Sequence, residues 1–494
     1  MYLLGIDIGT GGSRVVLVSG DGTVVQTTTQ DHQPFNAPNI GWAEQDPEDW
    51  WLAATTAIRA VLARADVGAS EIEAVGFSGQ MHGLVLLDQD DHVLRPSIIW
   101  CDQRTEKQCA DINGLFGEEK LIEMVSNPAL TNFTLTKLLW VRDNEPEAFR
   151  RIRSVMLPKD YVRFRLTGKK ATEVSDASGT LMLDVENRRW SREILSGLAI
   201  SDGILPELFE SQEIAGSVSK EAAVETGLMA GTPVVAGAGD NAAGAIGMGI
   251  VGPGQTSVTI GTSGVAFAVT DKPKIDLKGR IHTFCHAVPG RWHVTGVTQS
   301  AGLSLRWFRE NFDAERSFDE LVYDAAQIPP GAEGLLWTPY LMGERTPHID
   351  PGTRASLIGL TASHTKSHVV RAILEGVAFS LRDCLEVFEE SDIPVSNIRL
   401  GGGGAKSDLW RQIQADVYGK TVETISAEEG AAFGAALLAG VGSGVWNSVD
   451  EACDAAIEVA GRVEPEESGT ALMGDRYQAF RKIYEAVKPV LDMT

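Results

Sequence analysis

One strand-turn-strand motif occurs twice in this chain, and its repetition constrains the fold more than any other feature. In residues 3–18 an apolar strand reaches the turn Gly9-Thr10-Gly11-Gly12, and a second apolar strand follows. Residues 257–269 repeat this pattern around the turn Gly261-Thr262-Ser263-Gly264. Because an internal repeat marks a repeated structural unit, the chain is predicted to form two similar lobes that face each other across a cleft.

The first of these turns has the features of a phosphate-binding loop. It lies just after Asp7, and its glycines and Thr10 present backbone N–H groups and a hydroxyl in a concave arrangement that can hold an anion. Taken alone, the segment is equally consistent with a hairpin whose glycines serve only the turn. The second copy favours the phosphate interpretation, with one such loop in each lobe.

A small-residue stretch, Gly237-Ala-Gly-Asp240-Asn241-Ala-Ala-Gly244, lies between the two repeats. The apolar run 234–236 before it predicts a strand, and the residues after Asp240 predict the start of a helix. Asp240 is therefore expected where a strand passes into a helix. Its neighbours have almost no side chain, so that a substrate hydroxyl can reach the carboxylate.

Two other predicted strands end in polar residues. The strand 74–78 leads into Gly79-Gln-Met81-His82-Gly83, and the strand beginning at Ser97 reaches Trp100. Strand ends are where α/β sheets place ligand contacts. A single histidine at such a turn is more often structural, so Met81 and His82 become candidates only because of their neighbours.

Four consecutive glycines, Gly401 to Gly404, separate a predicted strand from a predicted helix. Glycine's backbone freedom costs stability, so we expect a functional reason for the run. Close approach of a flat ligand to the backbone explains it better than a flexible turn. Helices are also predicted over residues 48–65, with Asp46 as N-cap, and over residues 367–390 and 475–491.

Composition limits the classes of partner. A chain of 494 residues exceeds what one hydrophobic core usually supports, and a net charge of -24 disfavours nucleic acid and anionic membranes. No apolar run approaches the roughly 20 residues that span a bilayer. The five cysteines are odd in number and scattered, which fits a reducing compartment. We expect a cytoplasmic protein with no nucleic-acid or membrane partner.

Two further motifs do not support a function. Gly419-Lys-Thr421 lacks the first glycine of a P-loop and falls in a predicted helix. His282-Thr-Phe-Cys285-His286 offers metal-ligand types, but no further cluster of ligands accompanies it in the sequence. A structural role is favoured for this segment.

Taken in order, these motifs resemble the FGGY carbohydrate kinases, which are two-lobed members of the hexokinase, heat-shock-protein and actin superfamily. The resemblance covers essentially the whole chain. Within the family, several segments are most similar to the bacterial members that act on D-xylulose: Gly79-Gln-Met-His-Gly83, Ile99-Trp100-x-Asp102-x-Arg104, Leu157-Pro-Lys-Asp-Tyr161, Gly179-Thr-Leu-Met-Leu-Asp184 and Gly343-Glu-Arg-Thr-Pro-His348. Met182 stands where these members often have tryptophan, which leaves the identity of the sugar less secure.

The resemblance implies an α/β fold of two RNase H-like lobes, each a mixed five-stranded sheet flanked by helices, with the active-site cleft between them. It implies a sugar-binding lobe over residues 1–245 and an adenosine-binding lobe with closing C-terminal helices over residues 246–494. It also implies a homodimer.

The implied reaction is ATP-dependent phosphorylation of D-xylulose to D-xylulose 5-phosphate, with Mg²⁺ as cofactor and Asp240 as general base on the 5-hydroxyl. The resemblance assigns sugar contacts to Met81, His82, Trp100, Asp240 and Asn241. It assigns nucleotide contacts to Thr10, Gly11, Arg14, Thr262, Gly403, Gly404 and Asp408, with Gly302 and Trp307 nearby. Asp7 and Asp240 would bind the metal.

Two alternatives stay open from the residues. A sister kinase could act on ribulose, fuculose or glycerol, because these substrates require the same base and nucleotide loops. The two-lobed core also serves actin-like ATPases and sugar-responsive regulators. Asp240 and the Gln-Met-His turn favour an enzyme.

Overall fold

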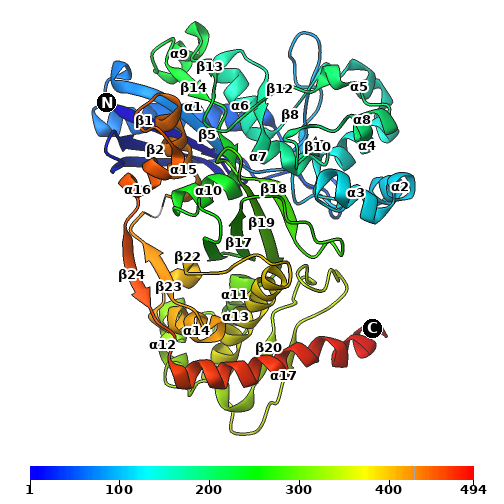
Figure 1. Ribbon diagram of the computed structural model, residues 1–494, viewed down its shortest axis with the longest axis vertical. Coiled ribbons are helices and arrows are strands. Elements are labelled where there is room, and N and C mark those ends of the chain that lie inside the picture. The colour runs from blue at the N-terminus through cyan, green and yellow to red at the C-terminus, as the bar shows by residue number, and fades with distance from the viewer. Residues whose placement is uncertain (428, 494) are drawn as a thin grey trace.

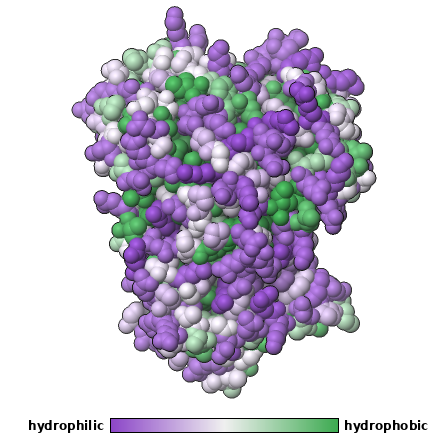
Figure 2. All heavy atoms as spheres, viewed as in Figure 1, coloured by the Kyte–Doolittle hydropathy of each residue, from purple (hydrophilic) through white to green (hydrophobic). Residues whose placement is uncertain are grey.

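The computed structural model describes residues 1–427 and 429–493 and shows two α/β lobes joined along the long axis of the molecule (Figure 1). The blue and cyan N-terminal part forms the upper lobe, and most of the yellow and red part forms the lower lobe. The face in Figure 2 is predominantly hydrophilic, and a group of apolar spheres is visible at the junction of the lobes. None of the helices in the described residues is long and apolar enough to cross a membrane.

The first lobe contains a mixed sheet of seven strands in the order β13-β14-β5-β1-β2-β3, with β15 also paired to β5. Strand β1 is antiparallel to β2 and parallel to β5. The strands are β1 (Tyr2–Ile8), β2 (Gly12–Ser19), β3 (Val24–Asp31), β5 (Ile72–Gly79), β13 (Ile214–Ser217), β14 (Pro233–Val235) and β15 (Ala238–Gly239).

The second lobe repeats this arrangement in the order β18-β19-β17-β16-β22-β23-β24. Strand β16 is antiparallel to β17 and parallel to β22, the same relation that β1 has to β2 and β5. The strands are β16 (Thr256–Ile260), β17 (Gly264–Thr270), β18 (His282–Cys285), β19 (Trp292–Thr298), β22 (Ile398–Gly402), β23 (Val422–Ile425) and β24 (Val459–Val463).

These sheets confirm the predicted two-lobed α/β fold and correct its strand count. Five strands in each sheet share one order, β3-β2-β1-β5-β14 in the first and β19-β17-β16-β22-β23 in the second. Each sheet nevertheless has seven strands and not the expected five. Three of the additional strands, β13, β18 and β24, lie at or near the sheet edges, and the fourth, β15, follows β14 after an interruption of two residues. Their pairing depends on distant segments that the local pattern does not reveal.

The predicted long helices are present. Helix α1 (Pro47–Ala65) begins after Asp46, whose carboxylate accepts a hydrogen bond from the Glu48 N–H at 3.0 Å. Helix α13 (Lys366–Glu390) is largely buried, as its apolar spacing indicates. Helix α17 (Glu467–Leu491) begins earlier than expected and runs across the lower lobe in Figure 1. Its first turns contain Gly469, where a side chain would collide with the Asp416 carboxylate, so the sequence there lacks the usual helical pattern.

The remaining elements connect and cover the sheets. The helices are α2 (Glu106–Phe116), α3 (Glu118–Val125), α4 (Thr134–Asn144), α5 (Pro146–Arg151), α6 (Pro158–Thr167), α7 (Val174–Ala177), α8 (Arg192–Gly197), α9 (Lys220–Thr226), α10 (Asp240–Gly247), α11 (Ala301–Phe312), α12 (Phe318–Ala325), α14 (Asp408–Tyr418), α15 (Gly430–Gly442) and α16 (Val449–Ala456). The short strands are β4 (Glu44–Gln45), β6 (Val85–Leu87), β7 (Ser97–Ile98), β8 (Ser154–Met156), β9 (Ala171–Glu173), β10 (Leu183–Asp184), β11 (Arg189–Trp190), β12 (Glu207–Phe209), β20 (Leu336–Thr338) and β21 (Ser356–Ile358).

Helix α15 lies late in the chain but packs on the first sheet, against β1, β5 and α10. The contact is backbone to backbone. A β-carbon on Gly5 would lie 1.9 Å from the Ala432 carbonyl oxygen, and one on Gly434 would lie 1.9 Å from that of Ala243. Only glycine permits so close an approach. We therefore propose that a boundary at residue 245 separates the two sheets. Helix α15 follows this boundary in the chain but packs with the first lobe.

Candidate active site between the lobes

A cavity of about 1140 Å³ lies between the lobes and brings together four of the predicted site residues. Asp240 and Asn241 reach it from the start of α10, Arg14 from β2, and Gly403 from the turn after β22. The lobes therefore meet at a space large enough for a nucleotide-sized ligand. The Asp240 position agrees with the sequence prediction, because β15 ends at Gly239 and α10 begins at the next residue.

Asp240 and Asp7 form a pair of neighbouring carboxylates. Burial and the charge of Asp7 raise the pKa of Asp240 to about 7. Burial also raises the pKa of Asp7, and its Oδ1 is buried with no hydrogen-bond partner among the described residues. Two half-buried carboxylates, one of them with an unsatisfied oxygen, match the oxygen ligands that Mg²⁺ prefers. The residues present therefore fit the implied metal.

Met81 and Asn241 lie beside Asp240. The Asn241 amide donates a hydrogen bond to Asp240 Oδ1 at 3.1 Å and approaches the Met81 sulfur at 3.6 Å. A β-carbon on Gly239 would lie 3.0 Å from Met81 Cγ, so a larger residue would press on the Met81 side chain. These contacts bring three predicted sugar residues to one place.

His82 lies at the turn after β5 with a φ of 67°. Its Nδ1 donates a hydrogen bond to the Gly179 carbonyl at 2.7 Å, and a β-carbon on Gly179 would lie 2.6 Å from the same nitrogen. Burial lowers the pKa of His82 to about 3, so the imidazole is neutral. With Nδ1 protonated, Nε2 is an acceptor, and no described residue hydrogen-bonds it.

Trp100 and Thr10 are in direct contact. The indole Nε1 donates a hydrogen bond to Thr10 Oγ1 at 2.9 Å, and the Trp100 side chain is 42% exposed. Trp100, which is predicted to contact the sugar, therefore lies next to the predicted phosphate-binding loop. Gly11 has open space where a side chain would lie, so a ligand can approach this turn closely.

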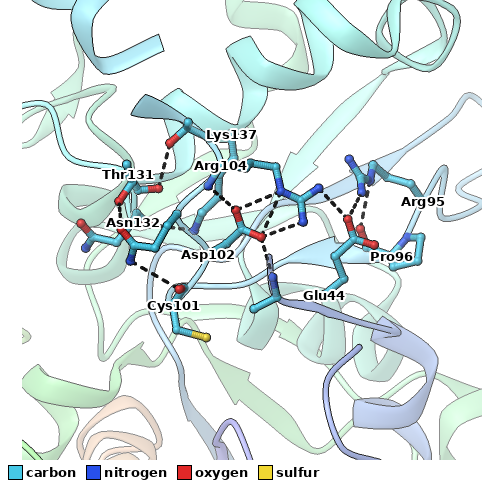
Figure 3. A network of polar contacts seen from close by, with 12 residues as sticks. Glu44, Arg95, Pro96, Cys101, Asp102, Arg104, Thr131, Asn132 and Lys137 are labelled. Atoms are coloured by element: carbon cyan, nitrogen blue, oxygen red, sulfur yellow. Dashed lines mark hydrogen bonds and ion pairs between the residues drawn. The ribbon is translucent and has the colours of Figure 1, made fainter. Parts of the chain in front are cut away.

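The segment that carries Trp100 is held by the network in Figure 3. The Arg104 guanidinium donates to Asp102 Oδ2 at 2.7 Å and to Glu44 Oε1 at 2.7 Å. It also lies over the Trp42 ring at 3.7 Å. These contacts fix the loop at 100–105 without involving Trp100, so the face of its indole ring stays available to a ligand while its N–H is bonded to Thr10.

The second-lobe turn positions Thr262 beside an arginine that sequence reasoning missed. Arg306 Nη2 on α11 donates to Thr262 Oγ1 at 3.1 Å. Gly302 must be glycine because a β-carbon would lie 2.3 Å from the Gly261 carbonyl oxygen. Trp307 stacks on Trp337 with ring centroids 5.6 Å apart. On sequence alone, Arg306 looks like any exposed helical arginine.

The glycine run has a partly different origin from the one we expected. Added β-carbons would lie 2.9 Å from Thr259 Oγ1 at Gly401, 2.4 Å from the Ile260 carbonyl oxygen at Gly402 and 2.6 Å from Ile260 Cδ1 at Gly404. Packing against β16 therefore explains three of these positions, which corrects the expectation that packing could not. Gly403 alone combines a place in the cavity lining with space for a ligand on its β-carbon side.

Asp408 does not line the cavity between the lobes. It is the first residue of α14, its side chain is exposed, and it forms an ion pair with Arg411. Lys406 and Arg411 line the cavity instead, and neither was selected from the sequence. The contact of Asp408 with adenosine stays a prediction.

A buried ionic cluster lies beside β15, the strand that precedes Asp240, and none of its residues was predicted to have a functional role. Lys159 Nζ lies 2.8 Å from Asp160, 3.2 Å from Glu173 and 3.4 Å from Asp176, and all four side chains are fully buried. Glu173 accepts hydrogen bonds from the backbone of α7. Ser175 on that helix accepts one from the Gly239 N–H at 3.1 Å. The cluster thus supports the residue that precedes Asp240.

Comparisons with known proteins identify the family. The model of the FGGY family of carbohydrate kinases matches with its N-terminal domain over residues 2–247 and its C-terminal domain over residues 256–443. The chain is 42% identical over 487 residues to the xylulose kinase of Bacillus subtilis, covering 99% of this chain and 97% of the relative.

Solved structures agree with this match. The xylulose kinase of Rhodospirillum rubrum superposes with a TM-score of 0.93 at 28% identity, covering 100% of both chains. A gluconate kinase of Lactobacillus acidophilus superposes with a TM-score of 0.92 at 27% identity, covering 98% of each chain. The conserved architecture thus accommodates kinases named for different sugars. The chain belongs to the FGGY family of carbohydrate kinases and is an ATP-dependent sugar kinase.

Proposed function

We propose that this enzyme transfers the γ-phosphoryl group of ATP to the 5-hydroxyl of D-xylulose and releases D-xylulose 5-phosphate and ADP. The observation that supports this most directly is Asp240, a carboxylate at a strand-to-helix junction that opens into the cavity between the lobes. The choice of D-xylulose rests on the full-length similarity to proteins named xylulose kinase.

In the proposed mechanism, Asp240 accepts the proton of the 5-hydroxyl while the oxygen attacks the γ-phosphorus and the bond to the β-phosphate oxygen breaks. Its raised pKa gives the carboxylate a higher proton affinity than an exposed aspartate has. The hydrogen bond from Asn241 orients the carboxylate. Arg14 and the two glycine-threonine turns would hold the phosphates, because backbone N–H groups and a guanidinium suit phosphate oxygens.

Asp7 and Asp240 would hold Mg²⁺ in this proposal. When bound, the ion would neutralise charge on the phosphate oxygens. Met81, His82, Trp100 and Asn241 would contact the sugar. Met81 and Asn241 lie beside Asp240, His82 follows Met81 in the same turn, and Trp100 lies beside Thr10. Closure of the lobes would exclude water and so limit hydrolysis of ATP.

An ADP-coupled assay against a panel of sugars tests the proposal. We expect kcat/KM for D-xylulose to exceed that for ribulose, fuculose, gluconate and glycerol by at least about tenfold, since a site that hydrogen-bonds one sugar leaves polar groups unpaired with another. The gluconate kinase with the same fold makes gluconate a necessary member of the panel. A higher kcat/KM for another sugar would replace D-xylulose, and ATPase activity indifferent to every sugar would favour an actin-like ATPase.

Changing His82 to Asn is expected to raise KM for the sugar about 3- to 10-fold, the effect of losing one hydrogen bond between neutral groups. Asn tolerates the positive φ at this position, so the turn should survive. KM for ATP should stay within about twofold. Because burial holds the pKa of His82 near 3, this imidazole should not make the sugar KM depend on pH between about 6 and 9. Unchanged sugar kinetics in the variant would contradict the contact.

A further inference from the structure

A second cavity, of about 760 Å³, lies between the lobes and shares no lining residue with the first. Its upper wall comes from α2, α3 and the segment 128–132 of the first lobe. Its lower wall comes from segments 277–282 and 344–351 and from Gln299 of the second lobe. The proposed mechanism assigns no role to this space.

Arg345 gives this cavity its chemical character. Among the residues that the structure describes, its guanidinium has no hydrogen-bond or ion-pair partner. The side chain is half-buried in the cavity wall, and this partial burial lowers its pKa. A half-buried guanidinium without a protein partner keeps its N–H donors available to a ligand in the cavity.

The neighbouring Glu344 forms no ion pair with the Arg345 guanidinium among the described residues, although its charge offsets part of the effect of burial on the Arg345 pKa. Its carboxylate accepts hydrogen bonds from Thr298 Oγ1 at 2.6 Å, from the Gln299 N–H at 3.0 Å and from the Arg345 N–H at 2.7 Å. Burial raises the pKa of Glu344 to about 7, which further weakens its charge. Glu344 therefore anchors the backbone of the loop and leaves the guanidinium facing the cavity.

Other unpartnered polar groups line the same space. The side-chain amides of Asn132 and Gln299 make no hydrogen bond with described residues, although Asn132 is only 6% exposed. His282 Nδ1 is buried without a partner, and burial lowers the pKa of His282 to about 3. These groups are neutral donors and acceptors, which suit hydroxyl and carbonyl oxygens.

The charge of the lining favours a neutral ligand over an anion. Arg280 also lines the cavity but is already paired with Asp276 and Glu390. The charged side chains of the lining are four acidic and three basic: Glu106, Glu118, Glu119, Glu344, Lys278, Arg280 and Arg345. Because the lining has no excess of positive charge, a neutral polyhydroxylated molecule fits the cavity better than a phosphate or a carboxylate does.

Contacts between side chains connect this cavity to the proposed sugar site. The Phe133 ring lies 4.9 Å from the His82 ring and 6.0 Å from the His282 ring. Lys137 donates to the carbonyls of both His82 and Asn132, and Figure 3 shows the lysine beside Asn132. The charge of Arg345 is also one of the smaller causes that lower the pKa of His82, so its electrostatic effect reaches the proposed sugar site.

We propose that Arg345 determines sugar specificity from the second lobe by donating hydrogen bonds to the keto end of the substrate, remote from the phosphorylated hydroxyl. This inference rests on the proposed sugar kinase function and extends it. A guanidinium can donate two parallel hydrogen bonds, which matches a carbonyl oxygen beside a hydroxyl. The predicted sugar contacts otherwise come from the first lobe, so Arg345 would make sugar binding sensitive to lobe closure.

Arg345→Met tests the inference, because methionine keeps an unbranched apolar stem and removes the charge. For the preferred sugar of the wild-type panel, KM should rise on the order of 10- to 100-fold, as expected for a hydrogen bond to a charged group. KM for ATP should stay within about twofold. Arg345→Lys should recover part of the loss, because it restores a cationic donor without the planar fork.

Arg280→Met is the matched control, since this arginine lines the same cavity but already has its partners. Its sugar KM should stay within about twofold of wild type. Arg345→Met should also lose discrimination between D-xylulose and xylitol, which lacks the carbonyl group. If Arg345→Met unfolds, as judged by its thermal transition, Arg345→Lys carries the same comparison.

The outcomes separate this inference from the proposed function. A wild-type enzyme that does not phosphorylate D-xylulose refutes the proposed substrate, and the Arg345 variants are then measured on the sugar that it does phosphorylate. A wild-type enzyme that is active while Arg345→Met keeps its sugar KM and its ketose preference refutes the role of Arg345. A KM effect equal to that of Arg280→Met also refutes it, because it would reflect general disturbance of the cavity.

Discussion

Replacing Asp240 with Asn is expected to reduce kcat for sugar phosphorylation by about 10²- to 10⁴-fold, the usual contribution of a general base. Asparagine has nearly the same shape but cannot accept the proton of the sugar hydroxyl. The hydrogen bond that Asn241 donates to Asp240 Oδ1 can still form to an amide oxygen, so the turn should keep its structure. Steady-state kinetics with saturating D-xylulose and ATP would measure the effect.

Nucleotide binding and folding serve as controls for this variant. Binding of a nonhydrolysable ATP analogue should persist, because Arg14 and the glycine-threonine turns are unchanged. Asp90→Asn, which alters an exposed acidic residue outside the cavities between the lobes, should retain wild-type turnover. Turnover of Asp240→Asn within about threefold of wild type would exclude the proposed base.

Replacing Lys159 with Met is expected to lower the free energy of unfolding by roughly 3 to 5 kcal/mol, the cost of breaking a buried ion pair by removing one partner. Burial opposes the charge of Lys159, but Asp160, Glu173 and Asp176 outweigh it and raise the lysine pKa above its ordinary value. The variant would leave these carboxylates buried without their shared cation. Urea unfolding, followed by circular dichroism, would give the difference.

A second substitution tests whether the loss comes from charge. Both oxygens of Asp176 lack a hydrogen-bond partner among the described residues, and burial raises its pKa. Adding Asp176→Asn to Lys159→Met should therefore restore part of the stability, with a coupling of at least about 0.5 kcal/mol. A loss below about 1 kcal/mol in the single variant would mean that the cluster contributes little.

The sequence predicted those parts of the molecule that depend on local pattern. The repeated hairpin, the Asp46 cap of α1 and the position of Asp240 at a strand-to-helix junction each follow from neighbouring residues. All three are present in the structure. Periodicity and turn chemistry act over a few residues, so a single chain displays them directly.

Long-range contacts account for what the sequence did not predict. The additional strands β13, β18 and β24 were not predicted. The packing of Gly404 on Ile260 and the hydrogen bond from Gly239 to Ser175 join segments that are distant in the chain. In the sequence, Arg345 was noted only as part of the segment Gly343–His348, which resembles the family, and no role was predicted for it. Its proposed role rests on the absence of a pairing side chain among the described residues, which follows from tertiary structure alone.

The packing of α15 on the first sheet has a consequence for how the molecule is made. The helix supplies Ala432, Phe433 and Leu437 to a buried cluster that also contains Leu3 and Ala74. During synthesis the earliest strands therefore leave the ribosome long before their last covering helix exists. Until the ribosome has added residues 430–442, the nascent first lobe exposes an apolar surface that α15 covers in the folded protein. Exposed apolar surface of this kind makes a partly folded chain prone to aggregation.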